Sequence, residues 1–178
     1  MKKIIILLVL ITLTLASCNL QPRKDSSNSI KSDNTAAVGI TQGKMAPDFK
    51  LKNIDGIEVK LSDYKGKIVI LNFFGVWCSW CIKEMPGFVK IYDEYKGKNV
   101  ELLVVDVGDT KDVLTDYLKK NNFMIKPVLD VDKKVSTDYR VSGFPTSYII
   151  DEKGIIKTVR PGYMDDASLK SILSTMVK

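Results

Sequence analysis

The chain opens with an apolar stretch and then turns into a long polar one. Residues 4–16 are apolar except for two threonines, and a short basic segment, residues 1–3, precedes them. This stretch is too short for a bilayer-spanning helix, which needs about 20 residues, and has the length of a signal-peptide core. Residues 19–44 are rich in Ser, Asn, Asp, Lys, Gln and Thr and have no helical or strand period. Because they cannot bury enough apolar surface to offset their ordering entropy, they predict a disordered tether.

From residue 45 the apolar positions become periodic. Residues 47–51 and 57–61 alternate apolar and polar side chains around the turn-forming segment 53–56, which predicts a hairpin with one wet face. Residues 67–74 and 100–107 are almost continuously apolar, as in strands covered on both faces. The pattern further predicts strands over 126–130, 146–151 and 155–159, and helices over 112–121, 133–139 and 165–177.

A long helix is predicted directly after the strand 67–74. Its apolar stripe runs from Cys81 to Tyr95, the helix ends near residue 96, and Pro86 inside it predicts a kink. Strands alternating with helices, followed by a hairpin and a closing helix, predict one α/β domain with a mixed sheet. At 178 residues the chain is long enough for one such domain with appendages, and too short for two.

Two of the three cysteines, Cys78 and Cys81, lie where this helix begins. Thiols separated by two residues at a helix N-terminus can close a small disulfide ring, and the helix field favours a thiolate at the first of them. This spacing predicts a thiol–disulfide oxidoreductase, with Cys78 as the nucleophile and Cys81 as the more buried resolving thiol. The third cysteine, Cys18, follows Leu15-Ala16-Ser17 directly after the apolar core.

The element order matches the thioredoxin fold, with an added N-terminal hairpin and an extra helix–strand unit near 111–130. From about residue 45 to the C-terminus the chain resembles the membrane-anchored thioredoxin-like TlpA/ResA family. The resemblance rests on several separate motifs: Ala46-Pro47-Asp48-Phe49, Leu71-Asn72-Phe73-Phe74, Trp77-Cys78-x-x-Cys81, Glu84-x-Pro86 and Gly143-Phe144-Pro145-Thr146. The predicted domains are therefore a signal peptide (1–17), a lipidated Cys18 with its tether (18–44) and a thioredoxin-like domain (45–178).

The resemblance assigns roles around the cysteine pair. Phe144, Pro145 and Thr146 resemble the cis-proline loop, which lies beside the disulfide in this family and offers backbone groups to an extended substrate. Glu84 lies one turn after Cys81 and can exchange protons with the thiols. Many relatives have a glutamate at this position, with an assigned role at the active site.

The sequence departs from its relatives at two positions close to the cysteines. Asn72 occupies the position where cytoplasmic thioredoxins carry a buried acid, so Glu84 is the remaining candidate for a proton relay. Ser79-Trp80 replaces the proline-containing dipeptide that is common between the two cysteines, and Trp80 alters the surface beside Cys78. Trp77 is expected to pack against the disulfide and shield it.

Cys18 and the residues before it resemble the lipobox of bacterial lipoproteins, which implies cleavage before Cys18 and a lipid on its sulfur. Two or more acyl chains give stable anchoring, so the domain is expected at the outer face of a bacterial membrane. The family implies a reductant role, with client proteins that carry disulfides, apocytochrome c or methionine sulfoxide reductase among them, and a transmembrane thiol electron donor. No cofactor is needed for two-cysteine exchange.

Several alternatives use the same residues or the same fold. Oxidation of client thiols needs no other groups, and a structural disulfide is disfavoured because a bridge over two residues constrains the unfolded chain little. A peroxiredoxin-like peroxidase would need threonine or serine where Gly75 stands. Zinc or copper binding lacks support because the chain has no histidine. The net charge of +6 comes from scattered lysines without interleaved aromatics, which gives no support for nucleic-acid binding.

Overall fold

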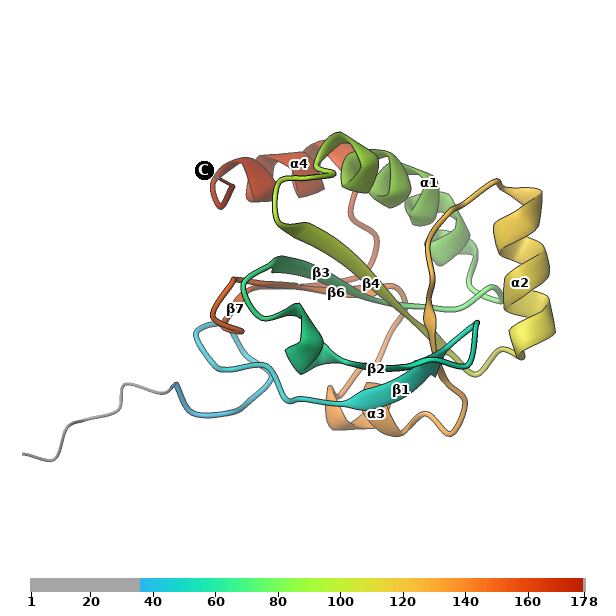
Figure 1. Ribbon diagram of the computed structural model, residues 1–178, viewed down its shortest axis with the longest axis horizontal. Coiled ribbons are helices and arrows are strands. Elements are labelled where there is room, and N and C mark those ends of the chain that lie inside the picture. Colours follow the sequence, from blue (N-terminus) through green and yellow to red (C-terminus); the bar gives the residue numbers. More distant parts are fainter. Residues whose placement is uncertain (1–35, 178) are drawn as a thin grey trace, which may run out of the picture. The chain divides into compact units, whose positions relative to one another are not determined.

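The computed structural model describes residues 36–177. Seven strands form one mixed sheet in the order β2-β1-β5-β4-β3-β6-β7 (Figure 1). The strands are β1 (Lys50–Asn53), β2 (Glu58–Lys60), β3 (Ile68–Phe74), β4 (Val100–Val107), β5 (Val128–Asp130), β6 (Thr146–Ile150) and β7 (Ile156–Pro161). The helices are the 3-10 turn η1 (Leu61–Tyr64), α1 (Ser79–Glu94), α2 (Lys111–Lys120), α3 (Lys134–Asp138) and α4 (Asp166–Ser174).

The centre of the sheet is β3, which pairs in parallel with β4 and antiparallel with β6. All seven residues of β3 are buried, as the continuous apolar run of this segment predicts. Helices α1, α2 and α4 supply the apolar core on one face of the sheet, around Phe74 and Phe88. Helix α3 and the segment that carries β1 and β2 supply the core of the other face, around Phe73 and Tyr139. Figure 1 shows α1 and α4 side by side above the sheet and α3 below it.

The predicted thioredoxin-like fold with two additions is confirmed. The N-terminal hairpin β1–β2 joins the sheet because β1 pairs antiparallel with β5. The extra unit consists of α2 and β5, and β5 lies between β1 and β4 in the sheet. The carboxyl ends of the parallel strands β3 and β4 thus meet beside the start of α1, which is where ligands and catalytic groups gather in open α/β sheets.

The predicted hairpin was wrong at its outer ends. The first strand begins at Lys50 and not at residue 47, since Asp48 turns its carboxylate toward the backbone and accepts the N–H of Ser62 at 3.0 Å. The second strand ends at Lys60, and Leu61 begins the 3-10 turn η1. The buried side chain of Leu61 continues the alternation of the strand, so the pattern does not show that the backbone turns at this residue.

The predicted start of the domain at residue 45 was also too late. The segment 36–44, placed in the tether from its polar composition, makes backbone hydrogen bonds to β7. Gly43 N–H donates to the carbonyl of Ile156 at 2.8 Å, and Ile156 N–H donates to the carbonyl of Lys44 at 2.9 Å. Backbone hydrogen bonds form whether the side chains are polar or apolar. The polar composition of this segment therefore does not reveal its pairing with β7. Helix α1 continues through Pro86, whose side chain is exposed.

The predicted signal peptide, the lipidation site Cys18 and the remaining tether lie outside the described residues. Within residues 36–177, the longest helices fall short of the length and apolar content that crossing a bilayer requires.

Candidate thiol–disulfide active site

Cys78 and Cys81 form a disulfide at the N-terminus of α1, with their Cα atoms 5.2 Å apart. Cys78 is the N-cap residue of the helix, and its sulfur accepts the backbone N–H of Cys81 at 3.2 Å. Its side chain is 8% exposed, whereas Cys81 is completely buried. Unpaired N–H groups and the helix field stabilise a thiolate at Cys78. Cys78 is thus slightly more exposed than Cys81, and the roles of nucleophile and resolving thiol stay predictions.

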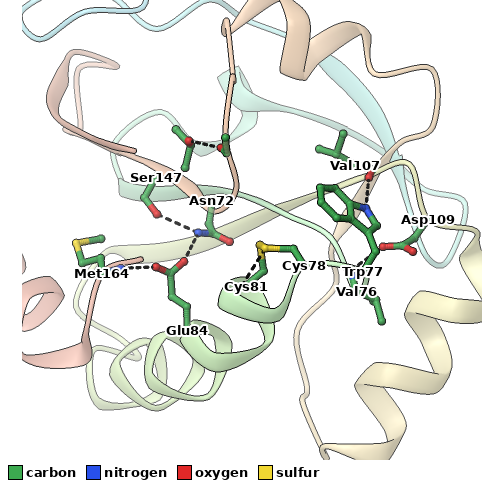
Figure 2. The surroundings of a disulfide bond; sticks show 12 residues. Asn72, Val76, Trp77, Cys78, Cys81, Glu84, Val107, Asp109, Ser147 and Met164 are labelled. Atoms are coloured by element: carbon green, nitrogen blue, oxygen red, sulfur yellow. Dashed lines mark hydrogen bonds between the residues drawn. A yellow bond between two sulfur atoms is a disulfide. The ribbon is translucent and has the colours of Figure 1, made fainter. Parts of the chain in front are cut away.

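The loop before Cys78 is fixed by the carboxyl end of β4 (Figure 2). The N–H of Val76 donates to Oδ2 of Asp109 at 2.6 Å, and the indole N–H of Trp77 donates to the carbonyl of Val107 at 3.0 Å. The Trp77 ring lies over Gly75, where a Cβ atom would come within 2.6 Å of Cε2 of the indole. Any side chain at residue 75 would therefore displace the ring.

Trp77 is 59% exposed, and its ring covers the loop at Gly75. Its ring meets Phe144 edge to face, with centroids 5.0 Å apart. The ring thus packs against the cis-proline loop, the exposed part of the ring forms surface next to Cys78, and shielding of the disulfide stays a prediction.

Glu84 is a buried carboxylate beneath the disulfide. It is 2% exposed, Oε1 accepts from Nδ2 of Asn72 at 2.8 Å, and Oε2 accepts from the N–H of Met164 at 2.6 Å. Burial raises the pKa of Glu84 to about 7, although both hydrogen bonds act in the opposite direction. A carboxyl group with this pKa exchanges protons readily near neutral pH.

Asn72 is the side-chain partner of Glu84. Its Nδ2 also donates to Oγ of Ser147 at 2.9 Å, whereas its Oδ1 is buried and has no hydrogen-bond partner within residues 36–177. In Figure 2 this oxygen points toward the disulfide. In the reduced protein a thiol S–H of the pair can donate to it, which would satisfy an acceptor that is costly to leave unpaired.

The Phe144–Pro145 peptide bond is cis, in agreement with the predicted cis-proline loop. Oγ1 of Thr146 donates to the carbonyl of Gly143 at 2.8 Å, which closes the loop, and the carbonyl of Pro145 accepts the N–H of Gly162 at 2.8 Å. Thr146 and Pro145 are both buried. The backbone of Phe144 makes no backbone hydrogen bond within the described part of the chain.

A second aromatic pair lies next to the cysteines. Trp80 is 54% exposed and packs against Tyr163, with ring centroids 5.7 Å apart. The ammonium group of Lys83 lies 4.8 Å from the Trp80 ring and 5.1 Å from the Tyr163 ring. Trp80 was predicted at the site from the sequence, but Tyr163 and Lys83 were missed. Tyr163 follows the strand β7, far from Trp80 along the chain, and no pattern signals the contact.

Asp109 was missed as well. It lies two residues after the end of β4, and only the pairing of β3 with β4 brings it to the loop before Cys78. A carboxylate after a buried parallel strand is the signal that would have pointed to it.

The sheet order, the cysteine pair at the start of α1 and the facing cis-proline loop define a thioredoxin-fold thiol–disulfide oxidoreductase. The AhpC/TSA family model matches residues 42–159 of the chain. The thiol-disulfide oxidoreductase ResA of Geobacillus kaustophilus is 35% identical over 142 residues, which cover 80% of this chain and 82% of the relative. The chain therefore belongs to the AhpC/TSA family and, within it, to the ResA-like thiol-disulfide oxidoreductases.

Solved structures agree with this assignment. A putative thiol:disulfide interchange protein DsbE from Chlorobium tepidum is similar with a TM-score of 0.71 and 28% identity, over 78% of this chain and 99% of that one. The exposed lipoprotein thioredoxin Etrx1 of Streptococcus pneumoniae is similar with a TM-score of 0.64 and 29% identity, over 72% and 99% of the two chains.

Proposed function

We propose that this oxidoreductase reduces disulfides of client proteins outside the cytoplasm, held at the membrane by a lipid on Cys18. The observation that carries the chemistry is that Cys78 keeps 8% exposure, whereas Cys81 and Glu84 below it are buried almost completely. A nucleophile at the surface and a resolving thiol below it suit a two-step exchange in which the client meets only the first sulfur.

In the first step the Cys78 thiolate attacks one sulfur of the client disulfide. A Cys78–client mixed disulfide forms, and the second client sulfur leaves as a thiolate that takes up a proton. In the second step the Cys81 thiolate attacks the Cys78 sulfur and expels the remaining client sulfur. Two electrons have then passed to the client, and the Cys78–Cys81 bond has formed. A dithiol of a transmembrane donor restores the reduced pair by the reverse exchange.

Glu84 is the proposed proton acceptor for Cys81 in the second step. Cys81 must lose its proton before it can attack, and the buried carboxylate has a pKa of about 7. Asn72 holds Glu84 through Nδ2 and presents its unpaired Oδ1 toward the sulfurs (Figure 2). We therefore assign Asn72 a positioning role and Glu84 a catalytic one.

The client is proposed to bind as an extended segment across the surface formed by Trp77, Phe144, Trp80 and Tyr163. The free backbone groups of Phe144 can pair with the client as an added strand pairs with a sheet edge. Aromatic rings on the surface favour apolar client side chains close to the cysteine. Lys83 makes no ion pair within residues 36–177, so it adds a preference for a client carboxylate near Trp80.

Two variants of exposed apolar residues on α1 test this surface. Trp80→Ala removes the ring that meets Tyr163, whereas Ile82→Ala changes a residue that lines the hollow toward α2. The substrate is a disulfide-bonded peptide with an aromatic residue next to cysteine. We expect Trp80→Ala to raise its KM by about tenfold, which corresponds to a loss of about 1.4 kcal/mol of binding free energy, and to leave kcat unchanged. Equal KM values for the two variants would contradict this surface.

The membrane location rests on the lipobox-like residues before Cys18. The similar pneumococcal protein is named an exposed lipoprotein, which supports the same arrangement here. Labelling of cells with radioactive palmitate tests it: the wild-type chain should carry label and fractionate with membranes, whereas Cys18→Ala should do neither. Apocytochrome c and methionine sulfoxide reductase remain the proposed clients.

A trap in cells tests the exchange itself. Cys81→Ala should accumulate mixed disulfides through Cys78, visible as slow bands that disappear on reduction and from which clients can be identified. The double variant Cys78→Ala, Cys81→Ala is the matched control and should form none. A Cys81→Ala protein that captures no partner would overturn the proposal.

The redox state of the pair in cells decides the direction. Rapid acid quenching followed by thiol labelling with a mass tag should find Cys78 and Cys81 mostly reduced if the protein is a reductant. A mostly oxidised pair would assign it the thiol-oxidase role instead. Peroxidase chemistry is disfavoured because the Trp77 ring occupies the space that a threonine or serine side chain at residue 75 would need.

A further inference from the structure

A second buried carboxyl group, Asp106, lies at the carboxyl end of β4, on the same side of the sheet as α1 and α2. It is completely buried, and its Oδ1 accepts the backbone N–H of Asp109 at 3.2 Å. Its Oδ2 has no hydrogen-bond donor within residues 36–177. Burying a carboxylate oxygen without a hydrogen-bond donor costs free energy. A proton bound to Oδ2 would remove this cost, provided that an acceptor lies next to it.

The neighbouring carboxyl group of Asp109 is the acceptor that this hydrogen would need. Two carboxylates cannot hydrogen-bond to each other, but one shared proton turns the first into a donor and leaves the second as an acceptor. Burial and the charge of Asp109 raise the pKa of Asp106 to about 8, in agreement with a carboxyl group that keeps its proton at neutral pH.

The adjacent strands give Asp106 apolar neighbours, α2 gives it a neutral tyrosine, and α3 brings one cation near the loop that follows it. Its strand neighbours in register are Phe74 on β3 and Leu129 on β5. From α2, the ring of Tyr117 packs at a tilt against Phe74, and burial raises the pKa of Tyr117 to about 12, so it stays neutral. At the start of α3 the ammonium group of Lys133 approaches Gly108, where a Cβ atom would lie 3.6 Å from Nζ.

From α1 the two cysteines pack in the same core as Phe74 and Tyr117, and they do not titrate while they form the disulfide. Glu84, the remaining buried acid on that helix, is engaged by Asn72 and Met164. A proton between the two aspartates would therefore be separable by experiment from the other titrations of the site.

Asp109 holds the loop that precedes the nucleophile. Its Oδ2 accepts from Val76 at 2.6 Å, the next residue, Trp77, is tied to Val107, and Cys78 follows. Figure 2 shows Asp109 beside Val76 and Trp77, on the far side of the disulfide from Glu84. The position of Cys78 thus depends on an acid whose own place is set by Asp106.

We propose that one proton shared between Asp106 and Asp109 fixes the loop 75–77 and so positions Cys78, which makes both aspartates positioning residues. Loss of the proton at alkaline pH places a second negative charge in a buried site and weakens the hold of Asp109 on Val76. The consequence for thiol exchange rests on the proposed function. The shared proton and its effect on the loop are tested in the oxidised protein without any client. Failure of this proposal is therefore distinguishable from failure of the proposed thiol exchange.

The test follows the indole N–H of Trp77 by ¹H–¹⁵N NMR in oxidised protein between pH 5.5 and 10. The chain has two tryptophans, so Trp80→Phe assigns the signals. We expect the Trp77 signal to shift with a midpoint near pH 8. In Asp106→Asn the amide donates to Asp109 permanently and has no proton to lose, so the signal should stay at its low-pH position throughout.

Two further variants secure the assignment. Glu84→Gln should keep the Trp77 midpoint, because Glu84 lies on the other side of the disulfide. Asp109→Asn retains an oxygen for Val76 but removes the charge that raises the pKa of Asp106, so its midpoint should move to lower pH. A Trp77 signal that is flat in the wild type, that titrates unchanged in Asp106→Asn, or that keeps its midpoint in Asp109→Asn would overturn the proposal.

Discussion

The buried carboxyl group of Glu84 leads to a prediction about stability. A carboxyl group whose pKa is raised by folding binds its proton more tightly in the native state than in the unfolded chain. Stability is therefore fully present below the unfolded pKa near 4.5 and is lost as the pH rises through the native value of about 7. Glu84→Gln carries no such proton, so its unfolding free energy should lack this dependence.

The magnitude follows from the two pKa values. The interval between 4.5 and about 7, at about 1.36 kcal/mol for each pH unit, corresponds to about 3 kcal/mol. Glutamine resembles the protonated acid, so at pH 4.5 the two proteins should differ little from this cause. Above pH 7.5 the variant should have gained about 3 kcal/mol relative to wild type.

The glutamine of the Glu84→Gln variant can also keep the hydrogen bonds of the carboxylate. If its amide nitrogen faces Asn72, the Asn72 amide turns over, so that Oδ1 accepts from the glutamine and from the hydroxyl of Ser147. The glutamine oxygen still accepts the N–H of Met164, as Oε2 of Glu84 does. The variant is therefore expected to fold, which makes the comparison possible.

Guanidinium unfolding of the oxidised proteins at a series of pH values between 4.5 and 8 measures the effect. The difference between variant and wild type cancels the other titrating groups. Glu94→Gln, on the same helix, is the control: Glu94 is exposed, and its hydrogen bond from Lys170 lowers its pKa, so wild type should gain relative to that variant as the pH rises. A Glu84→Gln difference that does not change with pH would refute the reasoning.

Three further outcomes can be measured. Asn72→Ala removes a donor that favours the charged carboxylate, so the pKa of Glu84 should rise above about 7 in ¹³C carboxyl titrations, and a lower value would contradict its assigned role. Leu114→Ala, at a fully buried position of α2, should lower the unfolding free energy by about 2–5 kcal/mol, while the exposed neighbour Val113→Ala changes it by about 0.5 kcal/mol or less. Asp165→Ala removes the side-chain cap of α4 and should lower the free energy of unfolding measured in denaturant, and no loss would exclude the cap as a source of stability.

Much of the site was predictable because it is local. The spacing of Cys78 and Cys81 places both sulfurs on one helical turn, and the apolar run of residues 67–74 predicts the buried strand that leads to them. The motif around Pro145 identified the facing loop, and its geometry agrees with that prediction.

The partners of Glu84 were not predictable in the same way. The sequence placed Glu84 near the thiols by helical spacing, yet left open whether it faces water. Its burial comes from Asn72 on β3 and from the backbone of Met164 after β7, which are far from it along the chain. Desolvation depends on what covers a group, and no residue near Glu84 in the sequence carries that information.

The sequence by itself determined the chemistry: two thiols at the start of a helix, a proline loop to face them, and an acid one turn further on. These features follow from short-range periodicity and spacing, which the local backbone enforces. Only the tertiary structure decided the environment: the burial of Glu84, the pairing of Asp106 with Asp109 behind Cys78, and the meeting of Trp80 with Tyr163. These depend on strand order and on distant segments packing together, and packing is what sets dielectric environment, pKa and surface shape.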